Sequence, residues 1–199
     1  MHKQTGIVEL LRQLIKTHEE ETSVTYGELV KSIGVQAYGL IIILFALPSA
    51  LPISVVPGFS FIFGLPIVFI ALHIIAAKPS LWLPTALANR TVETNQLKKV
   101  INKTLPYLSS IEHLLKPRWS FFTSPTMERL HGIVLLGLSF LLLLPIPFSN
   151  FIFATLIILF GLGISENDGV VLVLAYIGSF IYALFLTSLT RELFRLFAT

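Results

Sequence analysis

One pattern occurs twice in this sequence and limits its fold more than any other feature. Gly39 and Gly132 each begin a copy, in which twelve residues lead to the proline of a Leu-Pro-Ile triplet, and a Phe-Ile-Phe triplet follows. The copies are 93 residues apart up to these prolines and 90 residues apart after them. We therefore expect an internal duplication of a proline-broken apolar hairpin, with repeat 1 at about 5–95 and repeat 2 at about 104–199. Many membrane transporters build a central site from two such related units.

The composition of the chain places these hairpins in a membrane. Hydrophobic residues make up 54% of it, charged residues only 13%, and the mean hydropathy is +0.82. A soluble domain has about 25% charged residues. The start of the chain is polar and the first strongly apolar run begins near Val35, so we expect that run, rather than a cleaved signal peptide, to direct insertion. There is no cysteine, which excludes disulfides, thiolate metal sites and cysteine nucleophiles.

Five apolar segments form the expected membrane part. They comprise residues 36–51, 59–77, 131–144, 148–164 and 169–188. A helix needs about 20 residues to cross the hydrocarbon, with a range of roughly 17–25, so the first and third segments are short. Each hairpin is therefore either two tilted crossings with its prolines in an outer turn, or a re-entrant hairpin with its prolines near the midplane. The short segments and the uncharged turns favour re-entrant hairpins.

Two amphipathic helices are expected outside these segments. Residues 5–18 and 105–116 both have apolar residues at helical spacing, and each stretch precedes one hairpin. The predicted fold is therefore an all-α, polytopic integral membrane protein with a single membrane domain over residues 1–199. It contains two repeated proline-broken helical hairpins and amphipathic interfacial helices.

Local signals mark where two further helices begin. Thr25 and Glu28 have the spacing of a capping box, and Gly34 is expected to end or bend the helix that follows. Ser124 followed by Pro125 is typical of a helix start, with proline at the first helical position.

The distribution of basic residues predicts the orientation. Four Lys or Arg residues precede the first apolar segment and eight lie within 78–130, so both regions are expected on the cytoplasmic side, together with the N-terminus. Arg191 and Arg195, after the last segment, are exceptions to this rule. An even number of crossings between the copies makes the two hairpins parallel, and an odd number would make them inverted; both arrangements stay open.

The proline turns carry the candidate substrate-binding residues. Helix breaks free backbone groups, and helix N-termini carry partial positive charge, so such turns are able to bind an ion or a polar head group. The alternative is two tight turns in which Ser60 and Ser149 cap the following helices. The candidates are Pro52, Pro57, Gly58 and Ser60 in the first turn, and Pro145, Pro147, Ser149 and Asn150 in the second.

Two candidates lie outside the turns. His73 is within an apolar segment, where ionisable residues are usually functional, but Lys78 lies close enough to indicate that His73 is a neutral residue near a helix end. Asp168 precedes the last segment, where it either caps that helix or forms an acidic site with Glu166.

Several function classes find no support in the sequence. The motifs of nucleotide-binding loops, dinucleotide-binding folds, zinc proteases and serine hydrolases are absent, so no catalytic residue, cofactor or metal site is predicted and the chain is not expected to be an enzyme. The net charge of +3 comes with no base-reading motif, which argues against nucleic-acid binding.

Several short motifs lie along the chain, in the hairpins and in their flanks. They are Leu51-Pro52, Pro57-Gly58-x-Ser60, Gly64-Leu65-Pro66, Lys78-Pro79-x-Leu81-Trp82-Leu83-Pro84, Lys116-Pro117-Arg118, Leu144-Pro145-Ile146-Pro147-Phe148-x-Asn150 and Glu166-x-Asp168-Gly169. Together these motifs resemble those of the ExoD family of bacterial membrane proteins, and the resemblance covers about residues 20–190. It implies a polytopic protein of the bacterial inner membrane that is linked to exopolysaccharide production, and it fixes no reaction. The family offers no role for His73, and the candidate residues at matching positions are Pro52, Pro57, Gly58, Ser60, Pro145, Pro147, Asn150 and Asp168.

Two functional hypotheses from different classes follow. In the first, the chain is transporter-like or channel-like, and the proline turns meet to form one polar site. The chain is then expected to form a homo-oligomer, most simply a dimer, that contacts membrane lipids. In the second, it is a non-transporting scaffold that holds polysaccharide-synthesis proteins through the basic region 78–130. A membrane enzyme acting on a lipid-linked sugar ranks third, because no acid–base group of residues is evident.

Overall fold

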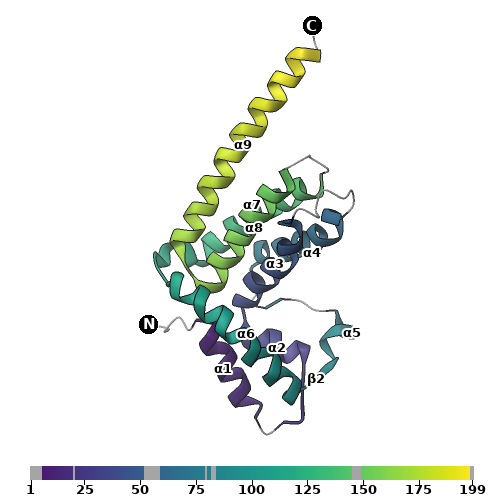
Figure 1. Ribbon diagram of the computed structural model, residues 1–199, viewed down its shortest axis with the longest axis vertical. Coiled ribbons are helices and arrows are strands. Elements are labelled where there is room, and N and C mark those ends of the chain that lie inside the picture. The colour runs from purple at the N-terminus through teal and green to yellow at the C-terminus, as the bar shows by residue number, and fades with distance from the viewer. Residues whose placement is uncertain are drawn as a thin grey trace.

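The computed structural model describes residues 6–19, 21–51, 59–78, 80–81, 84–144 and 149–197. These residues are mainly helical and form two parts (Figure 1). The upper part contains the apolar helices, and the lower part contains more polar helices and a small β-ribbon. The turn candidates Pro52, Pro57, Gly58, Pro145 and Pro147 lie outside the described residues.

The lower part is a small helical body with its own core. It contains α1 (Ile7–Thr17), α2 (Tyr26–Ile33), α5 (Thr85–Ala88), α6 (Thr94–Leu114) and the antiparallel strands β1 (Ser23–Thr25) and β2 (Thr91–Glu93). Leu14, Val24, Leu29 and Ile101 are buried together at its centre. The apolar faces of α1 and α6 thus pack within this body, and their placement on a membrane surface stays a prediction.

Two differences from the sequence-based expectations lie here. The second amphipathic helix, α6, begins at Thr94 rather than near 105 and continues through Pro106. The β-ribbon, with Val24 opposite Val92, was not expected, because strands of three residues are too short to show a period of two.

The capping box and the glycine bend are confirmed. The Glu28 amide donates to Thr25 Oγ1 over 3.2 Å, and the Thr25 amide donates to Glu28 Oε2 over 2.9 Å. The bond from the Thr25 amide, and after it the bond that the Thr25 hydroxyl donates to the same Oε2, lower the pKa of the Glu28 carboxyl from its ordinary value. Gly34, with φ of 65°, ends α2, and α3 leaves at a bend of 112°. A positive φ of this kind favours glycine because a Cβ atom would crowd the backbone.

The upper part contains the expected apolar helices. They are α3 (Gln36–Ser49), α4 (Phe59–Ile75), α7 (Pro125–Leu143), α8 (Ser149–Glu166) and α9 (Gly169–Phe197). Within the described residues, α7, α8 and α9 are long and apolar enough to cross a membrane, and the bent pair α2–α3 is a fourth candidate. The chain is therefore a multi-pass membrane protein. Proline at the start of α7 is confirmed, and this helix is 19 residues long although its uncharged run is shorter.

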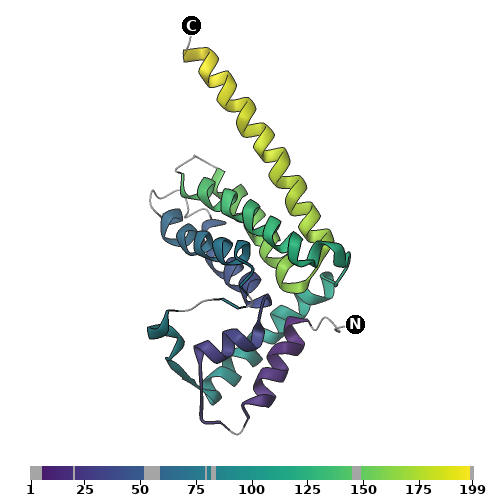
Figure 2. The same ribbon diagram turned by 180° about the vertical axis from the view of Figure 1, so that it is seen from behind.

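The two hairpins exchange partners. α3 packs most extensively against α8, and α4 against α7, while the contacts within each hairpin are smaller. One buried residue from each helix, Ile42, Ile67, Leu135 and Ile157, marks the common core. The two hairpins therefore pack against each other as one bundle (Figures 1 and 2).

The two closest helix crossings are alike. A Cβ atom at Gly39 would meet the carbonyl oxygen of Gly161 and the amide nitrogen of Ser165 on α8. One at Gly132 would meet the same two backbone groups on α4, in residues 90 positions earlier. Small residues of this kind let helix backbones approach closely in a membrane. The list of paired positions is Gly39 with Gly132, Ala71 with Gly161, and Ile75 with Ser165.

The ends of α4 and α8 are also alike. Ala77 and Asn167, 90 positions apart, have positive φ angles of 50° and 53°. The amide that follows donates in both cases to a carbonyl five residues earlier, from Lys78 to His73 over 3.2 Å and from Asp168 to Gly163 over 3.0 Å. The internal duplication stays a prediction, and these are the contacts that a duplication would require.

Candidate functional site

The helix ends that flank the two proline turns, called the tips below, lie on the side of the helix bundle away from the lower part, and α9 extends beyond them (Figure 1). The C-terminal ends of α3 and α7 and the N-terminal ends of α4 and α8 lie on this side in both views (Figures 1 and 2). Three buried serines gather near these helix ends, although the surrounding helices are almost wholly apolar. They are Ser49 at the end of α3, Ser60 at the start of α4 and Ser149 at the start of α8.

One hydrogen bond joins the two hairpins at their tips. The Nδ2 atom of Asn150 donates to Oγ of Ser60 over 2.9 Å, from the first turn of α8 to the first turn of α4. The two residues are 90 positions apart, which is the spacing of the sequence copies after the prolines. The structure thus brings together two predicted site residues that belong to different halves of the chain.

The last helix also reaches this region. Tyr182 of α9 donates its hydroxyl hydrogen to Oγ of Ser149 over 2.7 Å, and its ring meets that of Phe153 edge-on at 5.2 Å. Ser60 and Ser149 thus each accept a hydrogen bond from another helix, which the helix-capping alternative does not require. Sequence reasoning missed Tyr182, because nothing in the sequence pairs α9 with the proline turns.

Two buried polar atoms at the tips have no partner among the described residues. They are Oγ of Ser49 and Oδ1 of Asn150. An unpaired amide or hydroxyl in an apolar environment costs about 2–7 kcal/mol, depending on the reference state. The amide oxygen accepts hydrogen bonds and the hydroxyl both donates and accepts. The tips are therefore able to bind a group that carries hydrogen-bond donors.

His73 lies at the opposite end of α4 from the tips. Its ring is partly buried, and Nδ1 lies 2.8 Å from the carbonyl oxygen of Phe69, so Nδ1–H donates to that oxygen. His73 thus lies near a helix end and is hydrogen-bonded to a carbonyl group, and the choice between a structural and a functional role stays a prediction.

Asp168 also lies far from the tips, and it has a structural role. It is buried, its Oδ1 accepts from the amides of Val170 and Val171 at 2.9 and 3.4 Å, and its Oδ2 accepts from the amide of Lys116 at 3.0 Å. Nε of Arg118 lies 4.0 Å from the same Oδ2. The predicted cap of α9 is thus observed, and the carboxylate also fixes the segment before α7. This contact joins two of the motifs that resemble the ExoD family.

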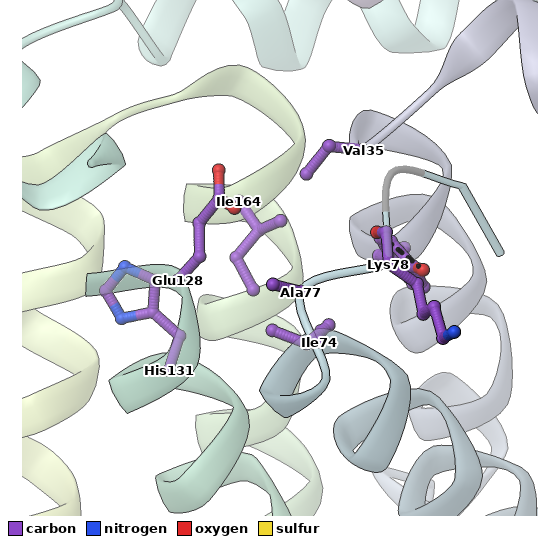
Figure 3. A pocket seen from close by; sticks show the side chains of 8 residues that line it. Val35, Ile74, Ala77, Lys78, Glu128, His131 and Ile164 are labelled. Carbon is purple, nitrogen blue, oxygen red and sulfur yellow. Dashed lines mark hydrogen bonds between the residues drawn. The ribbon is translucent and has the colours of Figure 1, made fainter. Parts of the chain in front are cut away.

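A pocket at the end of the hairpins next to the lower part was not predicted. Glu128, His131 and Lys78 lie around it (Figure 3), and Tyr38 also lines it. The ring of His131 is buried; its Nε2–H donates to the carbonyl oxygen of Phe122 over 2.8 Å, so Nδ1 accepts from the hydroxyl of Tyr176 over 2.6 Å. A sequence signal existed, since His131 stands 93 positions after Tyr38. The remaining lining residues are Val35, Ile74, Ala77 and Ile164.

The described residues offer no metal site of three or more His, Cys, Asp or Glu side chains. The ionisable groups of the upper part lie mainly at the end next to the lower part, and the tips are lined by neutral hydroxyl and amide groups.

Comparison with known proteins identifies the family. The family described as "Exopolysaccharide synthesis, ExoD" matches residues 7–188. Protein ExoD of Rhizobium meliloti is 32% identical over 158 residues, which are 77% of this chain and 65% of that protein. An uncharacterized protein of Synechocystis sp. is 31% identical over 135 residues, which are 67% of this chain and 63% of that protein. The chain thus covers less than two thirds of the length of either relative, and no solved structure matches it.

The family match extends across both hairpins, the pocket and Asp168, and the expectation drawn from the short motifs is confirmed. The chain belongs to the ExoD family of membrane proteins linked to exopolysaccharide synthesis.

Proposed function

We propose that this protein moves a polar solute across the bacterial inner membrane, with its binding site where the two hairpin tips meet. The hydrogen bond between Asn150 and Ser60 is the observation that carries the proposal. It joins matching positions of the two predicted repeats, as expected for a site on a pseudo-two-fold axis between them. Both hairpin tips lie on the same side of the helix bundle, which supports the parallel arrangement of the repeats.

The position of the tips along α9 favours their location within the hydrocarbon. Tyr182 of α9 is level with the tips through its bond to Ser149, and the next charged residue along α9 is Arg191. Nine helical residues correspond to about 13 Å, so Ser149, in the first turn of α8, lies about 13 Å short of Arg191 along α9. This distance favours re-entrant hairpins over full crossings.

The unpaired atoms at the tips suggest the chemistry of the solute. Oδ1 of Asn150 and Oγ of Ser49 suit a ligand with several hydrogen-bond donors. Sugar hydroxyls have this property, and the family is linked to exopolysaccharide synthesis. We therefore take a saccharide precursor as the first candidate and a small hydrated cation as the second.

The test is solute flux in proteoliposomes. Protein in vesicles is assayed with labelled sugar phosphates, lipid-linked sugars and monovalent cations, and Asn150→Ala and Ser60→Ala are expected to reduce flux severely. Asn102→Ala, an exposed residue of α6, and Thr155→Ala, whose hydroxyl bonds within α8, serve as matched controls and should keep it. Wild-type protein that moves none of these solutes, or variants that move them as well as wild type, would refute the proposal.

The basic residues of the lower part support a cytoplasmic location for it. The chain has no cysteine, so a single cysteine at residue 102 reports only its own position. Membrane-impermeant thiol reagents should label it in inside-out vesicles and leave it unlabelled in intact cells.

We also propose that the protein forms a homodimer. Large apolar side chains are exposed on α9 and α4, where they contact either lipid or a second copy of the chain. Cross-linking through single cysteines at these positions tests it: specific cross-links at a few of them support a dimer, and none at any position contradicts it. The exposed side chains are Phe180, Ile181, Leu184 and Phe185 on α9, and Phe61 and Ile62 on α4.

The scaffold hypothesis is favoured by one separate observation. The lower part has a core of its own, so it forms a compact polar body that is able to bind a partner protein. Lys99 and Lys103 are exposed on α6, and changing both to Glu leaves that core intact. Loss of partner co-purification and of secreted polymer in this variant, with flux never detected in wild type, would favour the scaffold.

A further inference from the structure

The pocket beside the lower part contains an unusual carboxylate. Glu128 lies on the first turns of α7 within a candidate membrane span, its side chain is half-buried, and among the described residues it has no hydrogen-bond or ion-pair partner. Figure 3 shows its carboxyl group directed away from the side chain of Lys78. Ionisable residues in membrane spans are rare and usually serve function.

We propose that Glu128 binds and releases the proton that drives transport, an inference that rests on the transport function proposed above. A carboxylate that leaves water without a counter-ion favours its protonated form. It returns to the charged form when water or a cation reaches it. Glu128 thus has the two states that a proton-coupling residue requires.

The groups that face Glu128 favour a proton over a metal cation. From α3, the hydroxyl of Tyr38 donates to the carbonyl oxygen of Lys78 over 3.1 Å, and on α7 both ring nitrogens of His131 are already bonded. From α8, the lining residue is the apolar Ile164. A hard cation needs about six oxygen ligands, and this pocket provides one free carboxylate, whereas a proton needs no more than that.

The charged neighbours lie in more polar surroundings. Lys78, after α4, and Arg129, next to Glu128 on α7, both have exposed side chains. Exposed charges are screened by the surrounding solution, so neither residue replaces a direct counter-ion for Glu128.

The position of the pocket links it to the tips. Val35 and Glu128 are 93 positions apart, as are Tyr38 and His131, and Ile74 and Ile164 are 90 apart. The pocket therefore lies between matching positions of the two hairpins, at the opposite end of the interface that carries Asn150 and Ser60. A change of charge at one end of this interface acts on the same two hairpins that form the binding site at the other end.

A hydrophobic carbodiimide tests proton binding directly. Dicyclohexylcarbodiimide modifies protonated carboxyl groups in apolar surroundings, and peptide mass spectrometry locates the product. With reconstituted wild-type protein, Glu128 should be modified, less so as the pH rises, while the exposed Glu93 should stay unmodified. Absence of modification at Glu128, or equal modification of both residues, would overturn the proposal.

Flux measurements test the coupling. Glu128→Gln should keep solute exchange at equal pH on both sides and lose the acceleration that a pH gradient gives wild type, whereas Glu128→Asp should restore it in part and Glu93→Gln should match wild type. Size-exclusion chromatography in detergent confirms that each variant folds. Acceleration that persists in Glu128→Gln refutes the coupling. A wild type with no flux refutes the proposed transport and the coupling with it, while carbodiimide modification still decides whether Glu128 binds a proton.

Discussion

The two hairpins of this protein share their backbone geometry and differ in their chemistry. Both have a glycine at the closest helix crossing and a left-handed residue at the end of the second helix. At matching positions, however, the first hairpin has Val35, Tyr38, Ser60 and Lys78, where the second has Glu128, His131, Asn150 and Asp168.

This difference separates two kinds of constraint. Positions where backbones touch allow little change, because a Cβ atom there collides with main-chain atoms that cannot move aside. Positions that line the pocket or the tips match in space but have different side chains in the two hairpins. The second hairpin alone supplies the carboxylate, the amide and the imidazole at these positions. The backbone arrangement that the two hairpins share, called the shared frame below, holds the helices in place. The side chains that differ between the halves are the first residues to test for function.

The strongest test of the shared frame is a large side chain at either crossing. Gly39→Leu and Gly132→Leu both push a side chain into backbone atoms of the opposite hairpin. Overpacking costs about 1–3 kcal/mol even where side chains can adjust, so both variants should lose most of their folded protein. Fluorescence-detected size-exclusion chromatography of the detergent extract measures this loss.

Gly137→Leu is the matched control, because a Cβ atom at Gly137 has no neighbour within 4 Å. It should elute as wild type does. If Gly132→Leu were tolerated while Gly39→Leu was not, the two crossings would differ in a way that a duplicated frame does not allow.

The second test compares the residues that follow the left-handed positions. Asp168→Ala removes the acceptor of three backbone amides and should cost about 3 kcal/mol, because these buried donors lose a charged partner. Lys78→Ala removes an exposed side chain and should stay within about 0.5 kcal/mol of wild type. The shift in thermal midpoint in detergent measures both, and similar shifts in the two variants would contradict this asymmetry.

Much of the membrane part was predictable from the sequence. Apolar runs place α3, α4 and α8 to within a few residues, because a membrane helix must satisfy its backbone internally and its side chains must suit lipid. They also place the start of α9, but this helix continues to Phe197, beyond the expected end at residue 188. The start of α7 lies before the apolar run because Glu128 and Arg129 belong to the helix although they are charged, and only the Ser124-Pro125 signal indicates it.

The site was predictable only in part. Ser60 and Asn150 were identified because they lie at the proline turns and in motifs that resemble the ExoD family, and their hydrogen bond follows from the exchange of partners between hairpins. That exchange is a tertiary arrangement that no local pattern records, so the contact of Tyr182 with Ser149 could not be foreseen. The pocket around Glu128 was not predicted either, although the 93-residue spacing of Tyr38 and His131 was a signal for it. His73 was chosen from hydropathy alone; it lies near the end of α4 with Nδ1 bonded to the carbonyl of Phe69, and a functional role for it stays a prediction.

The third test measures how strongly the halves are joined at the tips. Side-chain hydrogen bonds in membrane proteins contribute about 0.6 kcal/mol on average, so a double-mutant cycle of Asn150→Ala and Ser60→Ala should show coupling of about 0.6–1 kcal/mol. A cycle that combines Asn150→Ala with Thr190→Ala, on the exposed part of α9, should be additive. Additive effects in both cycles would mean that the Asn150–Ser60 bond adds nothing to stability.

The smallest expected effects concern the left-handed residues themselves. Ala77→Gly should raise stability by about 0.5–1 kcal/mol, because alanine is strained at positive φ and glycine is not. Asn167→Gly should gain clearly less, about 0.3 kcal/mol, since asparagine tolerates this conformation. Ala76→Gly is the control, because Ala76 does not have a positive φ angle. This variant should be neutral or slightly destabilising. Thermal midpoints in detergent rank the three. A larger gain at Asn167 than at Ala77 would mean that the two helix ends carry different strain despite their similar φ angles, and the shared frame would then stop short of these turns.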